Sequence, residues 1–344
     1  MKIRIVCYED PDLWILGKFA KNLKINLQII GHDAEIVKVP DPLADINHHI
    51  IFNDYNGKKN LFDTLMITHI DNIDKLNKLK NNLGSASLGI CMSFDTMCWL
   101  ENFGISSSKL CYVNPAYDCR VNIKKIVIGL FCRVQSDGRK REYFLDKLCK
   151  AIDPAFFKFV IMGDSWESQI TNLKFNNFEV DYFPSFDAEK YVELIPTLDY
   201  YLYMGMDEGQ MGVLDAHAAG VKTIVTAQGY HLDLLGSVTY PFVSFADLLQ
   251  IFLFLQLEKQ KLINSVSNLT WMDYTLKHVE IWNFLIDGKV IKSQYKDGFN
   301  SIFSLDTPKT NFSKFNNIFS YYNLILNKYI QKIYFYKNKF LKSI

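Results

Sequence analysis

The 344-residue sequence lacks several motifs that would identify common enzyme classes. It has no G-x-x-x-x-G-K-[ST] loop and no G-x-G-x-x-G after the first predicted strand, which argues against an ATPase and against a dinucleotide-dependent oxidoreductase. The G-x-S-x-G nucleophile motif is absent as well. His48 and His49 have no partner at the spacing of zinc ligands. We therefore expect neither a metal nor an organic cofactor.

Excess charge, paired cysteines and long apolar runs are also missing. The net charge of +1 gives no overall field that would favour nucleic acid as a partner. The seven cysteines contain no C-x-x-C pair, which favours a reducing compartment over a disulfide framework. The longest apolar stretch, residues 248–257, is about half as long as a membrane span. We expect a cytoplasmic protein that is soluble or at most peripheral at the inner face of the membrane.

Short β-like runs alternate with helix-period segments along most of the chain. This alternation predicts α/β domains with parallel sheets, because a short hairpin cannot return the chain in the same direction. The predicted strands cover residues 3–8, 34–39, 63–68, 87–92, 125–131, 156–162, 199–203 and 222–227. The predicted helices cover residues 16–30, 73–83, 94–103, 139–152, 188–195, 209–219, 245–262 and 274–285.

The alternating pattern breaks once, in a Pro- and Asn-containing loop over residues 114–122, and then restarts. Two α/β halves separated near residue 120 fit the usual size of a domain. We predict an N-terminal domain over residues 1–120, a second domain over residues 121–260, and a C-terminal region of helices and a basic, aromatic tail over residues 261–344.

The best-marked segment, GMDEGQMGVLDAHAAG, covers residues 205–220. Ligands of open parallel sheets bind beyond the carboxyl ends of the strands. Glu208 follows a predicted strand, and Asp215 lies seven residues further on in a predicted helix. Free amides at a helix start suit a phosphate, and carboxylates accept hydrogen bonds from sugar hydroxyls. On spacing alone, the same acids could equally favour a helix start on a solvated face.

Residues 208–225, EGQMGVLDAHAAGVKTIV, resemble the donor-site signature of family 4 glycosyltransferases of the GT-B fold, usually written E-G-F-G-x-x-x-x-E-A-x-A-x-G-x-P-V-[IV]. Upstream, KIVIGLFCRV with GRKREYFLDKL resembles the strand, loop and helix that open that family's donor domain, and FKFVIMGD resembles its second strand. The resemblance covers residues 124–235. It implies two Rossmann-like domains with parallel sheets facing across a cleft, plus a helical C-terminal region.

The resemblance also implies roles for individual residues of the second half. Glu208 would contact hydroxyls of the donor sugar, and Asp215 would hold the ribose. Arg133, with either Arg139 or Lys140, would neutralise the departing diphosphate. Further donor-binding candidates are Asp164, Gly209, Gln210, Met211, Gly212, Gly229 and Tyr230.

This chain departs from the family pattern at three positions. Asp215 replaces the usual Glu, Lys222 stands where the family has Pro, and Gly138 stands where the family has Lys. The last departure leaves the basic partner open between Arg139 and Lys140. For Tyr230, local packing is the alternative to ligand contact.

Candidate residues for the acceptor side lie in the first half. His69 and Asp71 follow the predicted strand over residues 63–68, where a side chain could orient an acceptor hydroxyl. The resemblance implies a similar role, since family members often carry a histidine in this region. A single histidine after a strand is also a common structural hydrogen-bonding group. Glu9 opens a loop that we expect to line the interdomain cleft.

The sequence predicts a metal-independent glycosyltransferase that moves a sugar from a nucleoside diphosphate sugar to a hydroxyl acceptor. A cell-surface glycan or a lipid-linked sugar would be a suitable acceptor, and the resemblance alone implies retention of configuration. The alternative is a non-catalytic, two-lobed α/β subunit that binds a ligand or a partner, which the departures at Asp215 and Gly138 favour.

The C-terminal tail over residues 309–344 has seven lysines, no acid, and aromatic residues near helical spacing. A basic amphipathic helix of this kind suits an anionic membrane surface. Packing of the tail on its own domain, with solvated lysines, is an equally good interpretation.

Overall fold

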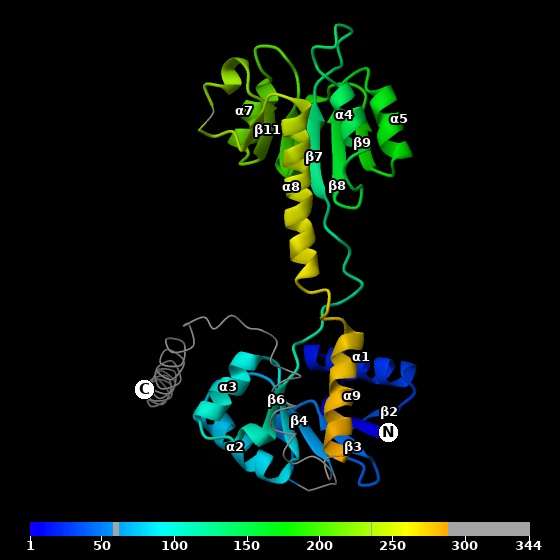
Figure 1. The fold of residues 1–344 in the computed structure, drawn as a ribbon, viewed down its shortest axis with the longest axis vertical. Coiled ribbons are helices and arrows are strands. Elements are labelled where there is room, and N and C mark those ends of the chain that lie inside the picture. The colour runs from blue at the N-terminus through cyan, green and yellow to red at the C-terminus, as the bar shows by residue number, and fades with distance from the viewer. Residues whose placement is uncertain (58–61, 235, 288–344) are drawn as a thin grey trace, which may run out of the picture. The chain divides into compact units, whose positions relative to one another are not determined.

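The computed structural model describes residues 1–57, 62–234 and 236–287, and these residues form two compact units (Figure 1). The first unit consists of Met1–Asp118 together with the described residues from Asn268 onward, and the second of Cys119–Ser267. The chain thus returns to the first unit, and helix α9 (Trp271–Asp287) belongs to that unit. The tail over residues 309–344 lies outside the described residues.

The first unit, as far as it is described, is built on a six-stranded sheet with the order β2-β1-β3-β4-β5-β6. All neighbouring strands are parallel. In chain order the strands are β1 (Lys2–Val6), β2 (Asp33–Val37), β3 (Ile46–His49), β4 (Asp63–Ile67), β5 (Leu88–Cys91) and β6 (Leu110–Tyr112). The chain leaves β1 toward β2 on one side and later adds β3 on the other, so the strand order reverses at the β1–β3 pair.

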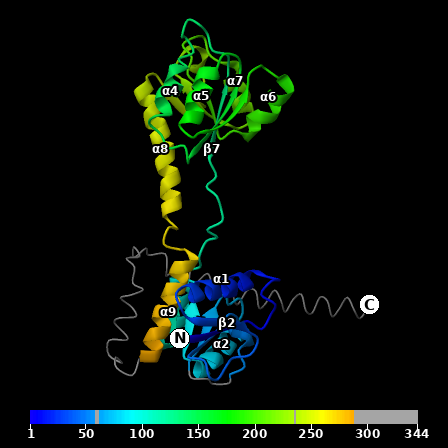
Figure 2. The same ribbon diagram turned by 90° about the vertical axis from the view of Figure 1, so that its right-hand side faces the viewer.

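Helices cover both faces of this sheet (Figures 1 and 2). Helix α1 (Ile15–Ile29) and α9 share one apolar core with the sheet. Helices α2 (Ile73–Ser85) and α3 (Phe94–Asn102) share the other. Two short 3-10 turns, η1 (Phe52–Asp54) and η2 (Ser107–Lys109), lie in the connections. The result is a three-layer α/β sandwich.

The described part of the second unit has a six-stranded parallel sheet with the order β12-β11-β10-β7-β8-β9. The strands are β7 (Ile126–Phe131), β8 (Phe157–Met162), β9 (Glu179–Phe183), β10 (Tyr200–Tyr203), β11 (Lys222–Thr226) and β12 (Tyr240–Phe242). Counted from β7, this is the doubly wound order, and the strand order reverses between β7 and β10.

Helices also cover both faces of the second sheet. One core joins α4 (Tyr143–Leu148), α5 (Glu167–Phe175) and α8 (Phe245–Asn264) to the sheet. The other joins α6 (Ala188–Leu194), η3 (Ile195–Thr197) and α7 (Met211–Ala218). A further 3-10 turn, η4 (Gly229–His231), follows β11. The prediction of two Rossmann-like domains with parallel sheets is thus confirmed.

Several elements differ from the sequence prediction, and strands β3, β6, β9 and β12 and helix α5 are not among those predicted. The pattern does not predict β3, because Asn47, His48 and His49 are polar although all three are fully buried. The helix predicted over residues 139–152 is wrong in extent, since α4 begins only at Tyr143. Arg141 has a φ of +50°, outside the helical region.

The buried guanidinium of Arg141 explains this interruption. It donates to the carbonyl oxygens of Met204 (2.5 Å) and Val243 (2.9 Å) and to the hydroxyl oxygen of Thr226 (2.8 Å). These bonds tie the chain before α4 to the carboxyl ends of β10, β11 and β12.

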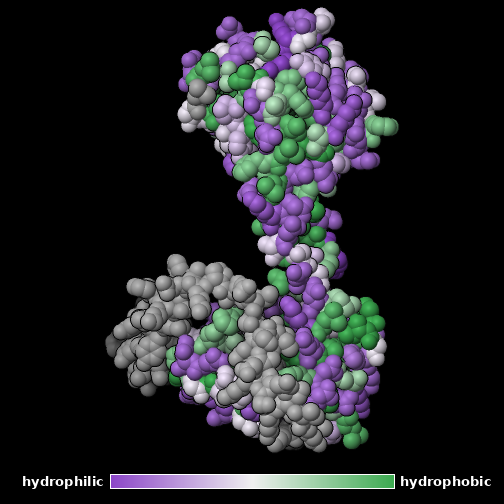
Figure 3. Space-filling model, in the orientation of Figure 1, coloured by the Kyte–Doolittle hydropathy of each residue, from purple (hydrophilic) through white to green (hydrophobic). Residues whose placement is uncertain are grey.

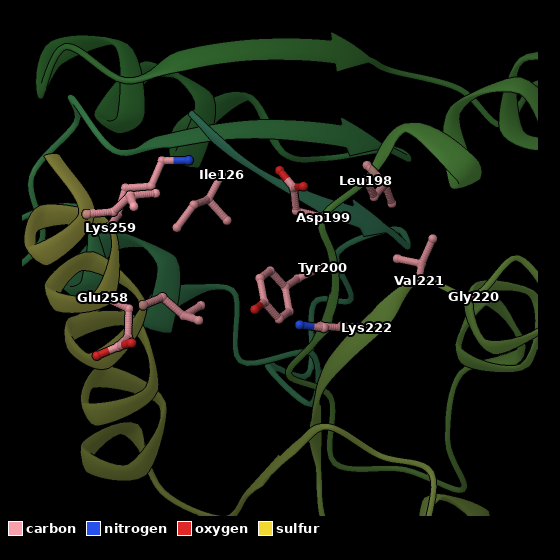
Figure 4. Close-up of a pocket in the computed structure, with 11 residues that line it drawn as sticks. Ile126, Leu198, Asp199, Tyr200, Gly220, Val221, Lys222, Glu258 and Lys259 are labelled. Carbon is pink, nitrogen blue, oxygen red and sulfur yellow. The ribbon is translucent and has the colours of Figure 1, made fainter. Parts of the chain in front are cut away.

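A groove of about 480 Å³ lies at the amino ends of β7, β10 and β11, against the second half of α8. Lys222 and Tyr200 lie side by side in it (Figure 4), with the ammonium nitrogen 5.8 Å from the centre of the ring. Leu257 and Leu262 of α8 are exposed, and Figure 3 shows hydrophobic and hydrophilic surface side by side on the second unit. This groove is at the opposite end of the sheet from the strand ends where ligands of such sheets bind.

None of the described helices is both long and apolar enough to cross a bilayer.

Buried histidines join β3 to α9 in the first unit. The rings of His48 and His278 are 5.1 Å apart, and each lies against Trp282. In the described part of the structure, neither Nε2 atom has a hydrogen-bond partner. Burial lowers the pKa of His278 to about 4 and that of His48 well below its usual value, so both rings are neutral in the folded protein.

This contact predicts a loss of stability in mild acid. The unfolded state takes up protons near the ordinary histidine pKa, whereas folded His278 does so only near pH 4. The free energy of unfolding should therefore fall as the pH drops through this window, by up to about 3 kcal/mol from His278. Urea unfolding between about pH 7 and about pH 4.5 measures it.

The matched variants for this experiment are His278→Phe and His69→Gln. The His278→Phe protein should show a shallower pH dependence, because the buried titrating ring is gone. His69 is exposed, so His69→Gln should follow the wild type. If the free energy of unfolding falls equally steeply with pH in the wild type and in His278→Phe, the prediction is wrong.

Candidate functional site

The carboxyl ends of β7 and β10 form the centre of the candidate site. These strands are hydrogen-bonded neighbours, and the strand order runs outward from them in opposite directions. In sheets of this order the connections that follow such a pair of strands diverge, and the space between them is the usual ligand position. Arg133 follows β7, and residues 204–210 follow β10.

A charged cluster occupies this position. The ammonium of Lys140 donates to the carboxylate of Asp207 (2.7 Å) and to the hydroxyl oxygen of Tyr203 (2.6 Å). The Tyr203 hydroxyl in turn donates to Asp207, with 2.7 Å to either carboxylate oxygen. The side chains of Lys140 and Asp207 are only 12% and 22% exposed.

The cluster fixes the charges of its members. Burial would by itself raise the pKa of Asp207, but the hydrogen bonds from Lys140 and Tyr203 outweigh burial and lower it. Burial and the Asp207 carboxylate raise the pKa of Tyr203, so its hydroxyl keeps its proton. An ammonium has three N–H groups, and two are used here. The third is available to an oxygen atom of a ligand.

Hydrogen bonds from backbone amides to side chains hold the turn between β10 and α7. The amide of Gly209 donates to the carboxylate of Asp207 (3.3 Å), and the amide of Gln210 donates to Nε2 of His231 (3.0 Å). The other ring nitrogen of His231 lies 3.0 Å from the carbonyl oxygen of Thr226. A carbonyl can only accept, so the proton is on Nδ1 and Nε2 is the acceptor. His231 is buried and joins the turn before α7 to the end of β11.

This turn packs closely against the loop that follows β11. Tyr230 donates its amide to the carbonyl oxygen of Glu208 (3.1 Å), and Gln228 donates its side-chain amide to the carbonyl oxygen of Asp207 (2.9 Å). A Cβ atom on Gly229 would lie 2.3 Å from the carbonyl oxygen of Glu208, and the φ of Gly229 is +54°. Only glycine therefore fits where the two loops meet.

The amides expected near a diphosphate are only partly free. Those of Gly209 and Gln210 are already engaged, as described above. Those of Met211 and Gly212, in the first turn of α7, have no acceptor among the described residues. An anion could therefore meet the N-terminal end of α7 at Met211 and Gly212.

The sequence-predicted carboxylates are placed differently from one another. The Glu208 side chain is exposed and makes no hydrogen bond within the described residues. Asp215 is also exposed and accepts a hydrogen bond from the hydroxyl of Tyr191 (2.5 Å). Asp207, the neighbour of Glu208, is the carboxylate that lies in the charged cluster. Asp207 and Asp215 are eight positions apart, as are the two acids of the family signature.

The structure places the two basic candidates, Arg139 and Lys140, in different surroundings. Arg139 is exposed and lies 3.6 Å from Asp137 at the surface, whereas Lys140 turns into the cluster. Arg133 is exposed at the end of β7. Asp164 follows β8, and its carbonyl oxygen accepts the amide of Val134 (3.0 Å), which ties the two strand ends together. Its side chain is exposed. The half-buried Tyr230 has a buried hydroxyl without a hydrogen-bond partner in the described part of the chain.

The acceptor-side candidates lie in the first unit. His69 is 78% exposed and 3.8 Å from Asp71, which also pairs with Lys75 (3.0 Å). Glu9 is exposed after β1. Strand β3 separates β1 from β4 in the sheet, so Glu9 and His69 do not follow adjacent strands. In the described part of the chain, no group of three or more His, Cys, Asp or Glu side chains could hold a metal ion.

No protein-family model matches the chain, and no curated protein matches it. Solved structures of glycosyltransferases do. The lipopolysaccharide outer core galactosyltransferase WaaB in its apo form is 12% identical, with 84% of this chain and 100% of that chain covered and a TM-score of 0.33. A glycosyltransferase from Rickettsia africae is 14% identical, with 83% and 98% covered and a TM-score of 0.34. HepE from Anabaena, in complex with UDP, is 14% identical, with 88% and 100% covered and a TM-score of 0.33. Similarities of this size transfer no residue role to this chain.

The contact between the two loops predicts a difference between two glycines of the second unit. Gly229 and Gly220 both have a positive φ, but a Cβ on Gly220 would meet no atom within 4 Å. Gly220→Ala should therefore cost only the left-handed backbone penalty, about 1–2 kcal/mol. Gly229→Ala should cost about 1–3 kcal/mol more, because the added methyl group strikes the Glu208 carbonyl. Chemical unfolding of the two variants measures this difference, and equal losses would contradict the geometry.

Proposed function

We propose that the chain is a glycosyltransferase that moves a sugar from a nucleoside diphosphate sugar to a hydroxyl group. Its donor site would be the crevice at the carboxyl ends of β7 and β10. The observation that carries the proposal is the cluster of Lys140, Asp207 and Tyr203 at the point where the strand order reverses, directly before the first turn of α7.

The proposal assigns the phosphate end of the donor to positive and partially positive groups. The third N–H of Lys140 and the side chain of Arg133 would face the diphosphate, together with the amides of Met211 and Gly212. These groups stabilise negative charge as it develops on the leaving diphosphate, which is how a fixed site lowers the barrier of such a transfer. Positive charge supplied by the chain itself supports transfer without a metal ion.

The sugar end of the donor would lie against carboxylates. Asp207 is ionised and aimed by two hydrogen bonds, so it can accept hydrogen bonds from sugar hydroxyls without reorganising. Asp215 would hold the ribose after releasing Tyr191. Glu208, the candidate chosen from sequence, is exposed and would contact the sugar only from the rim of the crevice.

Retention of configuration at the transferred carbon rests on the sequence resemblance alone. The proposed acceptor is a cell-surface glycan or a lipid-linked sugar. A cytoplasmic location, peripheral at the membrane, would suit such an acceptor.

Donor binding is the first test. Thermal unfolding with UDP-, GDP-, ADP- and CMP-sugars, and with NAD as control, should show stabilisation by one nucleotide sugar. A ligand at about a hundred times its dissociation constant adds about 2.7 kcal/mol, which is readily measured. Stabilisation by none of the nucleotide sugars, or by NAD alone, would refute the proposal and favour a non-catalytic binding subunit.

Paired variants test which residues form the site. Lys140→Gln and Asp207→Asn should each lower kcat/KM for the donor by about 100-fold or more, because each removes a group held at the reacting end. Arg139→Gln and Glu208→Gln change neighbouring, exposed side chains of the same chemistry and should cost less than about 10-fold, equivalent to about 1.4 kcal/mol.

Donor hydrolysis or transfer can be measured for all four variants, with melting temperatures to show that each is folded. A larger loss of kcat/KM in Glu208→Gln than in Asp207→Asn would show that Glu208, and not Asp207, contacts the donor sugar.

A further inference from the structure

The first unit has its own point of strand-order reversal, at the β1–β3 pair. Val6 of β1 is in register with His49 of β3, the last residue of that strand. Tyr8 follows β1 and lies two residues beyond this pair. The same rule that locates the donor site in the second unit therefore places the ligand crevice of the first unit beside Tyr8 and His49.

A polar network bridges the two strands at this point. The hydroxyl of Tyr8 is 3.1 Å from Nδ1 of His49, and the two rings stack. On the far side of the imidazole, Nε2 of His49 lies 3.5 Å from the carboxylate of Asp63, an electrostatic contact, and has no hydrogen-bond partner in the described part of the chain. Asp63 also accepts a hydrogen bond from the hydroxyl of Tyr55 (3.1 Å). His49 and Asp63 are almost completely buried, whereas Tyr8 is half-buried just beyond the carboxyl end of β1.

The negative charge of Asp63 favours one tautomer of His49, and that tautomer sets the direction of the hydrogen bond between Tyr8 and His49. A neutral imidazole has one N–H, and the carboxylate of Asp63 can only accept when ionised. The N–H therefore belongs on Nε2, facing Asp63, and Nδ1 carries the lone pair. Tyr8 must then donate its proton to His49, which leaves the Tyr8 oxygen as an acceptor only. The Tyr8 oxygen is suited to a ligand group that donates a hydrogen bond, such as a sugar hydroxyl.

Burial and the charges of Asp63 and Asp54 raise the pKa of Tyr8 to about 12. The hydroxyl therefore keeps the proton that it donates to His49 throughout the neutral range.

We propose that Tyr8 receives the hydrogen bond of an acceptor hydroxyl, and that His49 and Asp63 are positioning residues that hold Tyr8 as an obligate hydrogen-bond acceptor. The role in transfer rests on the proposed glycosyltransferase function. The binding of a hydroxyl-bearing ligand at Tyr8 does not depend on it and can be tested separately.

The binding test uses methyl hexopyranosides of glucose, galactose and mannose as probes. Ligand-observed NMR should detect binding of at least one glycoside to the wild type. Tyr8→Phe removes one oxygen atom and should weaken that binding about 3- to 10-fold, the usual effect of one hydrogen bond. Tyr143→Phe changes an exposed tyrosine of the second unit and should leave binding unchanged.

Analogues of the bound glycoside test the direction of the hydrogen bond. Replacing the critical hydroxyl by hydrogen or by fluorine should weaken binding to the wild type equally, because fluorine cannot donate. In Tyr8→Phe the parent glycoside should bind no better than these analogues, as expected for a coupled pair. Binding of none of the glycosides, equal binding to wild type and Tyr8→Phe, or full binding of the fluorinated analogue would overturn the inference.

Two variants of His49 separate positioning from folding. His49→Gln retains an oxygen that can accept from Tyr8 and should bind the glycoside within about 3-fold of the wild type, whereas His49→Leu should lose about 3- to 10-fold. Melting temperatures report folding independently. Equal losses in both variants would show that His49 has only a structural role.

Turnover distinguishes this inference from the proposed function. With an active donor, Tyr8→Phe should raise the KM for the acceptor and leave acceptor-independent hydrolysis of the donor unchanged, whereas the control Tyr143→Phe should alter neither. A fall in donor hydrolysis in Tyr8→Phe would refute an acceptor-side role. If no donor is turned over by the wild type, the proposed function fails, and the glycoside measurements still decide whether Tyr8 binds a hydroxyl.

Discussion

The parallel arrangement of the strands is the constraint on which both candidate sites depend. A parallel sheet collects the residues that follow its strands at one edge, and a reversal of strand order leaves a crevice at one pair of strands. In the second unit this pair is β7 and β10, and in the first unit it is β1 and β3. Both pairs carry a network of buried and half-buried polar groups at or just beyond the carboxyl ends of their strands, centred on Asp207 and on His49.

Stability alone gives little reason for these polar groups. Removing the charges of Lys140 and Asp207 from water costs free energy, and a well-packed apolar pair would be at least as stable. Neutral side chains would also fill the space around His49 and Asp63 without leaving polar atoms to be satisfied. Buried polar groups placed where the fold makes a crevice are therefore better explained by ligand binding than by folding.

The regular parts of the fold could be predicted from the sequence because their apolar residues recur at the period of a helix or a strand. Strand β3 could not, since three of its four residues are polar. The late start of the helix predicted over residues 139–152 could not be predicted either, because in the sequence the buried Arg141 with its positive φ is indistinguishable from a solvated, basic helix start. The adjacency of β1 and β3, which brings Tyr8 to His49, depends on strand order, which is not visible in local periodicity.

Sequence reasoning also could not decide which of two adjacent, chemically similar residues belongs to the candidate site, because that depends on the direction in which each side chain points. Asp207 and Glu208 are both acids after β10, and Arg139 and Lys140 are both basic before α4; composition cannot tell which of each pair turns inward. The structure turns Asp207 and Lys140 toward each other and leaves their neighbours exposed. An inward group is held by its partners before a ligand arrives, so it loses less conformational freedom on binding than an exposed one. Pre-positioning of this kind, more than the mere presence of an acid or a base, is what gives Asp207, Lys140 and Tyr8 the stronger claim to function.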